Sequence, residues 1–134
     1  MKKITLLSVL LLMGCLSILT LSRCDKDTNC YVNVSVIDET TKRPVSGVFI
    51  KIDIDSSYIN ASGMTDATGT FRATFAAPAI FNVAATYETG YDDEYPIEDF
   101  RCYRKGNNTV RLLEGDTVFT TINLEPDIIR EARR

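Results

Sequence analysis

The chain has 134 residues, a formal net charge of −3, four cysteines and neither histidine nor tryptophan. Its length suits one domain with its own hydrophobic core. Its acidic balance argues against the clustered basic surface by which proteins bind nucleic acids, so we expect no nucleic-acid partner. The lack of histidine removes the commonest general base and most zinc sites.

The first 23 residues have the pattern of an export signal. Lys2 and Lys3 precede an uncharged, largely apolar run at 4–22. This run is long enough to span a bilayer if it is retained, so a cleaved signal peptide and an uncleaved anchor both stay open. In either case we expect the rest of the chain to be exported from the cytoplasm.

Two cysteines are candidates for lipidation. Cys24, in "LSRCDKD", lies where the apolar run ends and a charged segment begins, which resembles the acidic start of surface-exposed lipoproteins of the Bacteroidota. Cys15, in "LMGC", follows a small residue as in the bacterial lipobox, but lipidation there would leave the apolar stretch "LSILTLS" on the mature protein. We predict lipidation at Cys24, with Cys15 and ordinary signal cleavage as the two alternatives.

The parity of the cysteines supports Cys24 and predicts a disulfide. Removal of residues 1–23 leaves Cys30 and Cys102 as an even pair that an oxidising compartment can join. Two separate thiols are the alternative. From Cys24 onward the chain carries 12 basic and 18 acidic residues, a formal charge of −6 that favours solubility and mutual repulsion at a surface.

Apolar and polar residues alternate with a period of two along the exported part, as in "YVNVSVID" and "VFIKIDID". Such alternation places one face of a strand in a core and the other in water. Gly, Pro, Asn and Asp punctuate the segments between strands. The spacing predicts an all-β fold with a single seven-stranded, Ig-like sandwich after the signal segment. The predicted strands span 31–38, 48–55, 69–75, 79–88, 99–105, 109–113 and 117–124.

The stretch "GMTDATGTF" predicts a tight turn that leads into a strand. Asp66 can accept hydrogen bonds from backbone amides two residues on, and Gly69 can adopt the positive φ that a short hairpin requires. Phe71 then begins the next strand on the core side. After Pro126, "DIIREARR" has helix signals but is too short to be stable alone, so we expect a frayed tail.

These motifs, in this order, resemble carboxypeptidase regulatory-like domains, which are prealbumin-type sandwiches common in exported proteins of the Bacteroidota. The resemblance covers roughly 31–124 and implies a prealbumin-like sandwich used as a spacer, docking module or stabiliser. We divide the chain into a lipoprotein-type signal peptide, a tether, a β-sandwich domain and a C-terminal tail, at 1–23, 24–30, 31–125 and 126–134. The matching positions are Pro44, Val45, Gly47, Val48, Thr65, Asp66, Gly69, Phe71, Gly90 and Tyr91.

No arrangement of catalytic residues is visible in the sequence. A prealbumin-like hydrolase that acts on a urate derivative depends on histidines, and this chain has none. The chain also lacks a GxSxG nucleophile elbow, a GxxxxGK[ST] phosphate loop and a CxxC pair. We therefore expect no enzyme, no catalytic residue and no cofactor.

The longest predicted connection, 88–99, is the candidate binding loop. Its tyrosines can form a platform for a peptide or a glycan. Its carboxylates are candidate Ca²⁺ ligands, although they lack the regular ligand spacing of an EF-hand loop. We expect no other metal site. The candidate residues are Tyr91, Asp92, Asp93, Glu94 and Tyr95, of which Asp92, Asp93 and Glu94 carry the Ca²⁺ possibility.

Together these features predict a non-catalytic lipoprotein of the cell envelope, anchored to the outer membrane or the cell surface, whose sandwich binds or braces another envelope component. The expected partners are a membrane, through the lipid anchor, and another envelope protein. One alternative is a small ligand-binding protein that takes a peptide, a glycan or Ca²⁺ through the 88–99 loop. Another is a subunit of a surface polymer such as a fimbria.

Overall fold

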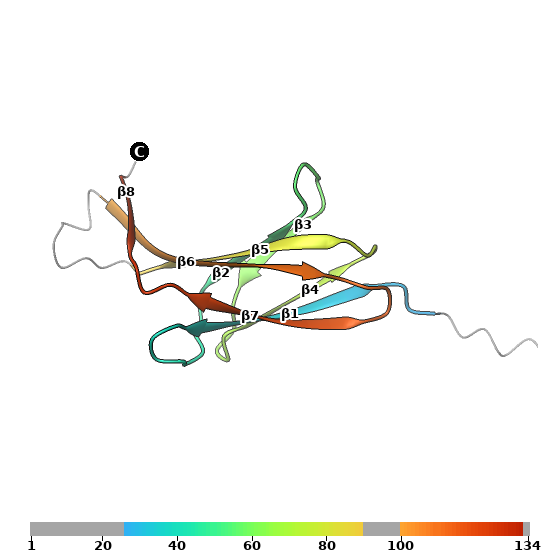
Figure 1. Cartoon of the computed structure of the whole chain (residues 1–134), viewed down its shortest axis with the longest axis horizontal. Coiled ribbons are helices and arrows are strands. Elements are labelled where there is room, and N and C mark those ends of the chain that lie inside the picture. The colour runs from blue at the N-terminus through green and yellow to red at the C-terminus, as the bar shows by residue number, and fades with distance from the viewer. Residues whose placement is uncertain (1–25, 90–99, 133–134) are drawn as a thin grey trace, which may run out of the picture.

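The computed structural model describes residues 26–89 and 100–132. These residues form eight strands in two sheets, without a helix (Figure 1). The three-stranded sheet has the order β4-β1-β7, and the five-stranded sheet has the order β3-β2-β5-β6-β8. The strands are β1 (Cys30–Asp38), β2 (Phe49–Asp53), β3 (Asn60–Met64), β4 (Thr70–Phe75), β5 (Ile80–Glu88), β6 (Phe100–Arg111), β7 (Thr117–Leu124) and β8 (Ile129–Ala132).

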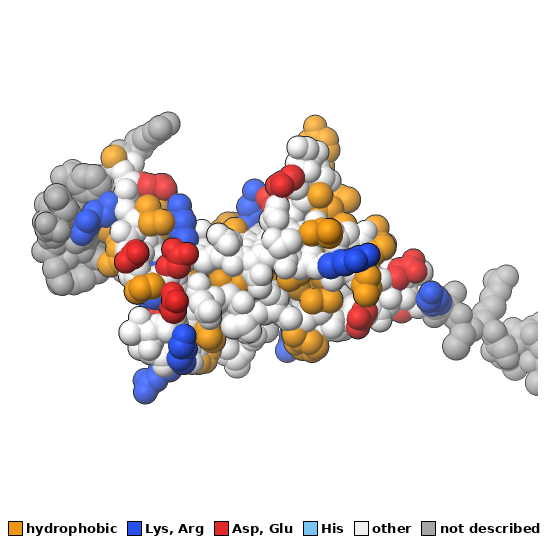
Figure 2. Space-filling view, viewed as in Figure 1, with side chains coloured by type: hydrophobic (Ala, Val, Ile, Leu, Met, Phe, Trp, Pro, Cys, Tyr) orange, Lys and Arg blue, Asp and Glu red, His pale blue; other side chains and the backbone are white. Residues whose placement is uncertain are grey.

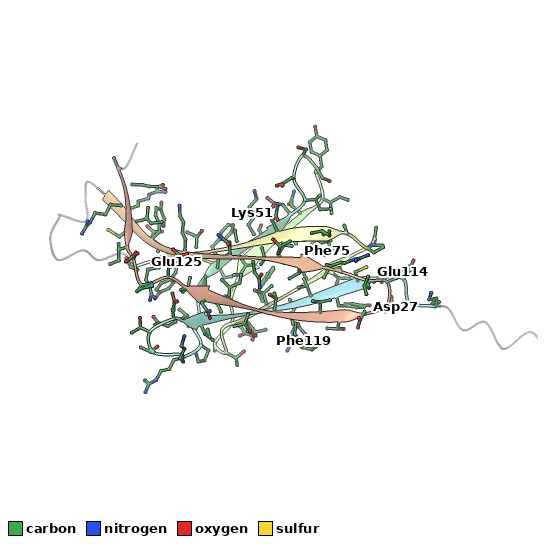
Figure 3. The ribbon with its side chains drawn as sticks, in the orientation of Figure 1. Asp27, Lys51, Phe75, Glu114, Phe119 and Glu125 are labelled. Carbon is green, nitrogen blue, oxygen red and sulfur yellow. The ribbon has the colours of Figure 1, made fainter. Side chains whose placement is uncertain are left out.

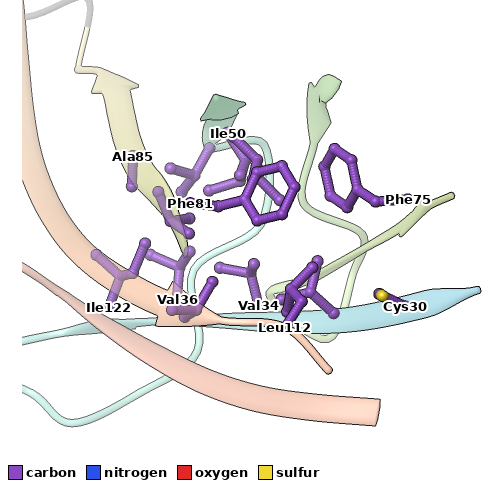
Figure 4. Close-up of a cluster of buried hydrophobic side chains, with 14 of the residues drawn as sticks. Cys30, Val34, Val36, Ile50, Phe75, Phe81, Ala85, Leu112 and Ile122 are labelled. Carbon is purple, nitrogen blue, oxygen red and sulfur yellow. The ribbon is translucent and has the colours of Figure 1, made fainter. Parts of the chain in front are cut away.

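The inner faces of the two sheets meet in one hydrophobic core (Figure 4). In β1 the side chains of Val32, Val34 and Val36 are buried and alternate with residues that face outward. The rings of Phe75 and Phe81, one from each sheet, lie with their centroids 4.2 Å apart. The alternation in the sequence thus reports the inner faces correctly, and the prediction of an all-β sandwich is confirmed.

The turn at "GMTDATGTF" forms as predicted. The carboxylate of Asp66 accepts hydrogen bonds from the Thr68 hydroxyl (2.6 Å) and from the amides of Thr68 (2.9 Å) and Thr70 (3.0 Å). These bonds, led by that of the hydroxyl, lower the pKa of Asp66. Gly69 has a φ of 73°, and a Cβ there would lie 3.0 Å from the carbonyl oxygen of Val36. Glycine is therefore required both by the backbone conformation and by the close approach of β1.

The structure has eight strands instead of the seven predicted, and β3 is the first difference. Its sequence, "NASGM", lacks the large alternating side chains by which strands are recognised. Small residues are needed because the ring of Phe71 lies against this strand: a Cβ on Gly63 would be 2.5 Å from Cε2 of Phe71. The strand depends on a close tertiary contact that its own pattern does not reveal.

The second difference is β6, which is one strand where two are predicted. Gly106 lies opposite Ala85 in the ladder with β5, so "GNN" is not a turn. The backbone of β6 passes so close to β7 that a Cβ on Gly106 would overlap the carbonyl oxygen of Asn123 and lie 2.6 Å from Cγ2 of Ile122. Glycine is present here because two strands approach closely, not because the chain turns.

The third difference is β8, which lies within the predicted tail. Ile129 pairs with Tyr103 and Ala132 pairs with Phe100, so the segment extends the five-stranded sheet at its edge. The expectation of a frayed tail at 126–134 is therefore wrong for residues 129–132. At the other terminus β1 begins at Cys30, the last residue of the predicted tether.

The predicted disulfide between Cys30 and Cys102 is also wrong, because the two buried residues are not joined to each other. Cys30 begins β1 next to the turn at 112–116, where the amide of Gly115 donates to the carbonyl oxygen of Asn29. Cys102 precedes Leu112 by ten positions along β6, which is about 33 Å in an extended strand. A disulfide requires Cα atoms within about 7 Å. Burial, the largest cause, raises the pKa of the Cys30 thiol and so disfavours its reactive thiolate.

Replacement of Gly106 with Ala should destabilise the domain by about 3 kcal/mol, because the added Cβ must push β6 away from β7. Thermal unfolding of the Gly106→Ala variant measures this, and Asn107→Ala, at the adjacent exposed position, is the matched control. A melting temperature equal to that of Asn107→Ala would show that the two strands are not in tight contact.

Candidate binding surface

Residues 26–29, which lead into β1, are fastened to the turn between β6 and β7. The amide of Gly115 donates to the carbonyl oxygen of Asn29 at 2.9 Å. Gly115 has a φ of 70°, and a Cβ there would lie 2.9 Å from the carbonyl oxygen of Asp27, so glycine allows the two segments to pack. Figure 3 shows Asp27 and Glu114 together at the end of the sandwich from which the N-terminal segment leaves.

Side chains add to this attachment. The hydroxyl of Tyr31 donates to Oδ2 of Asp27 at 2.6 Å, and this bond raises the pKa of Tyr31 and lowers the pKa of Asp27. Lys26 and Glu114 form an exposed ion pair at 3.7 Å, which contributes little by itself because water screens it. The path of the chain is therefore fixed as far as Asp27, the neighbour of Lys26.

The 88–99 connection begins and ends at the opposite end of the sandwich. Glu88, at the end of β5, is paired with Tyr103, whereas Ile80, at the start of β5, is paired with Arg111. Arg111 directly precedes the turn at 112–116, on which residues 26–29 pack and which we call the tether turn. Eight positions of extended strand separate Ile80 from Glu88, about 26 Å. The predicted binding residues and lipidation sites lie outside the described residues; they are Tyr91, Asp92, Asp93, Glu94, Tyr95, Cys24 and Cys15.

Arg104 joins the two sheets at this second end. Its side chain projects from β6 and donates to the carboxylate of Asp38 at the end of β1. It also donates to the carbonyl oxygens of Leu124 (3.0 Å) and Glu125 (2.7 Å), where β7 ends. Only 15% of the Arg104 side chain and 17% of the Asp38 side chain are exposed to solvent. One guanidinium thus ties β6 to the ends of β1 and β7.

The Arg104 guanidinium holds the pKa of Asp38 at about 2, below its ordinary value of 3.8, and the amides of Thr41 and Thr40 add to this effect. The sequence analysis does not identify this pair. The sequence does contain a signal for it. Arg104 lies two positions from both Cys102 and Gly106, which are buried, and alternate residues of a strand face the same side, so the Arg104 side chain faces inward. An inward-facing arginine in a small domain requires a partner.

A shallow cleft of about 290 Å³ lies on the outer face of the three-stranded sheet, and we call it the Arg72 cleft. The strand register places Arg72 of β4, Asn33 of β1 and Phe119 of β7 in one row across the sheet. Phe119, at the rim, is 76% exposed and lies on the outer side of β7 (Figure 3). The cleft is lined by Tyr31, Val32, Asn33, Arg72, Ala73, Thr74 and Thr117.

The cleft can donate hydrogen bonds to an anionic or carbonyl group. Within the described residues, the side chains of Arg72 and Asn33 have no hydrogen-bond partner. No carboxylate is among the lining residues, so Arg72 supplies the charge of the cleft. A volume of this size is at the lower limit for small-molecule pockets, and it suits one side chain or one ring of a larger partner.

The described ranges contain no group of three or more Cys, Asp or Glu side chains that could hold a metal ion. Within 26–89 and 100–132 no helix has the length and apolar character needed to cross a membrane.

No family model matches this chain, and no curated protein matches it. Among solved structures, the chain is similar to 5-hydroxyisourate hydrolase of Klebsiella pneumoniae, with 17% sequence identity and a TM-score of 0.42. The match covers 78% of this chain and 99% of the hydrolase chain. A likeness of this degree concerns the fold alone and assigns no role to any residue of this chain.

The comparison corrects the expectation that the protein is not an enzyme. The solved structure with this likeness is an enzyme, so the sequence-based exclusion of catalysis is withdrawn. That exclusion depended on motifs that this chain lacks, and the absence of known motifs does not exclude chemistry that uses other residues.

Replacement of Arg104 with Met should lower the melting temperature by roughly 10 °C, because charge-assisted hydrogen bonds contribute about 2 kcal/mol and each kcal/mol corresponds to about 4–8 °C in a domain of this size. Lys105→Met is the matched control, since it removes a charge at the adjacent position with only two exposed contacts, the ion pair with Glu131 and the position of the ammonium over the Tyr103 ring. Thermal unfolding at several pH values measures both.

The pH dependence identifies the partner of Arg104. Because the folded pKa of Asp38 is lowered to about 2, the stability from this pair is complete above the ordinary value of 3.8 and is lost as the pH falls through about 2. The difference between the wild type and Arg104→Met should therefore shrink over that interval. A difference that stays constant down to pH 2 would show that Asp38 is not the partner.

Proposed function

We propose that the protein is an exported lipoprotein that holds a β-sandwich at an envelope membrane, where the sandwich binds or braces another envelope component. The observation that carries this proposal is the fastened tether. Residues 26–29 join the domain rigidly at one end, immediately after the predicted lipidation site at Cys24. A domain held in this way has a defined orientation at the membrane, which is the arrangement that a binding or bracing module requires.

The Arg72 cleft is the described surface best suited to the partner. The cleft contains Arg72, which has no ion-pair partner among the described residues, and the exposed ring of Phe119 lies beside it in the same row of the sheet. Both residue types are enriched where proteins bind one another. The cleft is too small to enclose most small-molecule ligands. Its volume therefore favours a macromolecular partner that inserts one group. The unpaired guanidinium favours an acidic group on that partner.

Lipidation should depend on Cys24, because this cysteine separates the apolar segment from the tether. Cells that express the full chain are fed a clickable fatty acid, and the label on the wild type is compared with that on Cys24→Ala and Cys15→Ala. We expect Cys24→Ala to lose the label and Cys15→Ala to keep it. Loss of the label in Cys15→Ala alone would move the anchor to Cys15. A wild-type protein that takes up no label would contradict the lipoprotein proposal.

Partner binding should depend on the Arg72 cleft. We expect the double variant Arg72→Glu with Phe119→Ser to lose its main crosslinked neighbour in intact envelopes by about tenfold, because a reversed charge and a lost aromatic anchor remove attraction and apolar contact together. Crosslinking followed by mass spectrometry measures this loss.

The matched control is Lys51→Glu with Met64→Ser on the outer face of the five-stranded sheet, which makes the same change of charge and removes an apolar side chain of similar exposure. Both variants should unfold at similar temperatures. If both keep the same neighbours as the wild type, the cleft is not the binding surface.

A further inference from the structure

We infer that the sandwich lies against the membrane through the side that extends from the tether end to the β2–β3 loop, with Ile80, Leu113 and Tyr58 in the headgroup region of the bilayer. The inference rests on the proposed anchoring of the chain at the membrane. It adds which face of the domain the lipid covers, and it leaves the Arg72 cleft on the opposite sheet open to a partner.

The short tether brings this end of the domain to the bilayer. Lys26 is the first described residue, and its path is fixed by the contacts of 26–29 with the 112–116 turn. Cys24 precedes Lys26 by two residues, which span at most about 7 Å. If the apolar run is retained instead, it ends at Ser22, roughly 14 Å away. Either anchor places the tether turn at the membrane surface.

Exposed apolar side chains gather on this side of the molecule. Ile80 is 61% exposed at the start of β5, and Leu113, in the tether turn, is 48% exposed. The two are near neighbours, because the amide of Leu112 donates to the carbonyl oxygen of Ala79. Figure 2 shows hydrophobic side chains along the slope between the β2–β3 loop and the end from which the N-terminal segment leaves.

The β2–β3 loop adds an aromatic residue to this surface. Tyr58 is 100% exposed. The loop is joined to the start of β5 by a hydrogen bond of 3.0 Å from the side-chain amide of Asn82 to Asp55, so it lies on the same side as Ile80. Tyrosine is enriched at membrane interfaces, where its ring contacts lipid and its hydroxyl stays hydrated.

Charge limits the kind of bilayer that this surface fits. Asp27, Glu114 and Asp116 surround the tether, and Lys26 is paired with Glu114. Arg111, opposite Ile80 in the ladder, is available for a lipid phosphate. Because carboxylates prevail near the tether, contact must depend on apolar burial, and zwitterionic lipid is the appropriate test surface.

The absence of tryptophan from the chain allows a direct measurement. Full-length lipidated protein carrying Ile80→Trp or Leu113→Trp is reconstituted into phosphatidylcholine vesicles with and without brominated acyl chains, which quench nearby indole fluorescence. Met64→Trp is the matched control, because Met64 lies on the outer face of the same sheet and is 62% exposed. Its neighbour Phe49 pairs with Thr86, six positions along β5 from Ile80.

We expect Ile80→Trp and Leu113→Trp to show blue-shifted emission and at least about twofold more quenching than Met64→Trp, because only the first two reach the lipid. Oxidative footprinting of the unsubstituted protein gives a second readout: Tyr58 should be protected by vesicles and Phe119 should not.

Protein that floats with the vesicles but shows equal quenching at all three positions and no protection of Tyr58 would overturn the inference while the anchor stands. Protein that does not float with the vesicles would contradict the anchor itself, and with it the inference.

Discussion

The side chain of Arg104 holds the two sheets together at one end, where it joins β6 to the ends of β1 and β7. Its planar guanidinium donates to the Asp38 carboxylate and to two backbone carbonyl oxygens where β7 ends. Lysine could not replace it, because a single ammonium does not present donors in a fixed fork. The same carboxylate accepts the amides of Thr40 and Thr41 and so shapes the turn that leads from β1 toward β2.

A second constraint acts in the middle of the sandwich. The backbones of β6 and β7 approach closely at Gly106, which brings Arg104, two positions earlier, within reach of the ends of β1 and β7. At the tether end, Gly115 allows residues 26–29 to pack on the turn between the same two strands. Two glycines, one in β6 and one in the turn between β6 and β7, therefore decide how closely the sheets approach and how the chain enters the domain.

Local pattern predicts the parts of the fold that are determined locally. The valines of β1 alternate as their burial does. Asp66 and Gly69 form the turn that the Asp66 carboxylate and the positive φ of Gly69 favour. The sequence pattern does not predict strands whose formation depends on a tertiary contact. Small residues make β3 because the Phe71 ring fills the space, and Gly106 continues a strand because β7 lies against it. The even number of cysteines in the exported part suggests a disulfide, but the register of β6 holds Cys30 and Cys102 far apart.

The same distinction applies to the binding surfaces. Arg72, Asn33 and Phe119 are far apart in the sequence, and only the pairing of β1 with β4 and β7 brings them into one row. The tether, in contrast, is visible as a change from apolar to charged residues. The sequence alone therefore predicts which segment would tether the domain. Which residues share a binding surface follows only from strand register.

The parallel pairing of β1 with β7 has a mechanical consequence. The tether enters at the start of β1, and β7 ends at the opposite end of the sandwich, next to Arg104. A force applied between the N-terminal segment and that far end acts along both strands and loads all the hydrogen bonds of their ladder at once. Such shear must break the bonds together, whereas a hairpin pulled open from one end loses them one by one. A domain connected in this way resists extension between its N-terminal segment and its far end, which would suit the membrane anchoring that we propose.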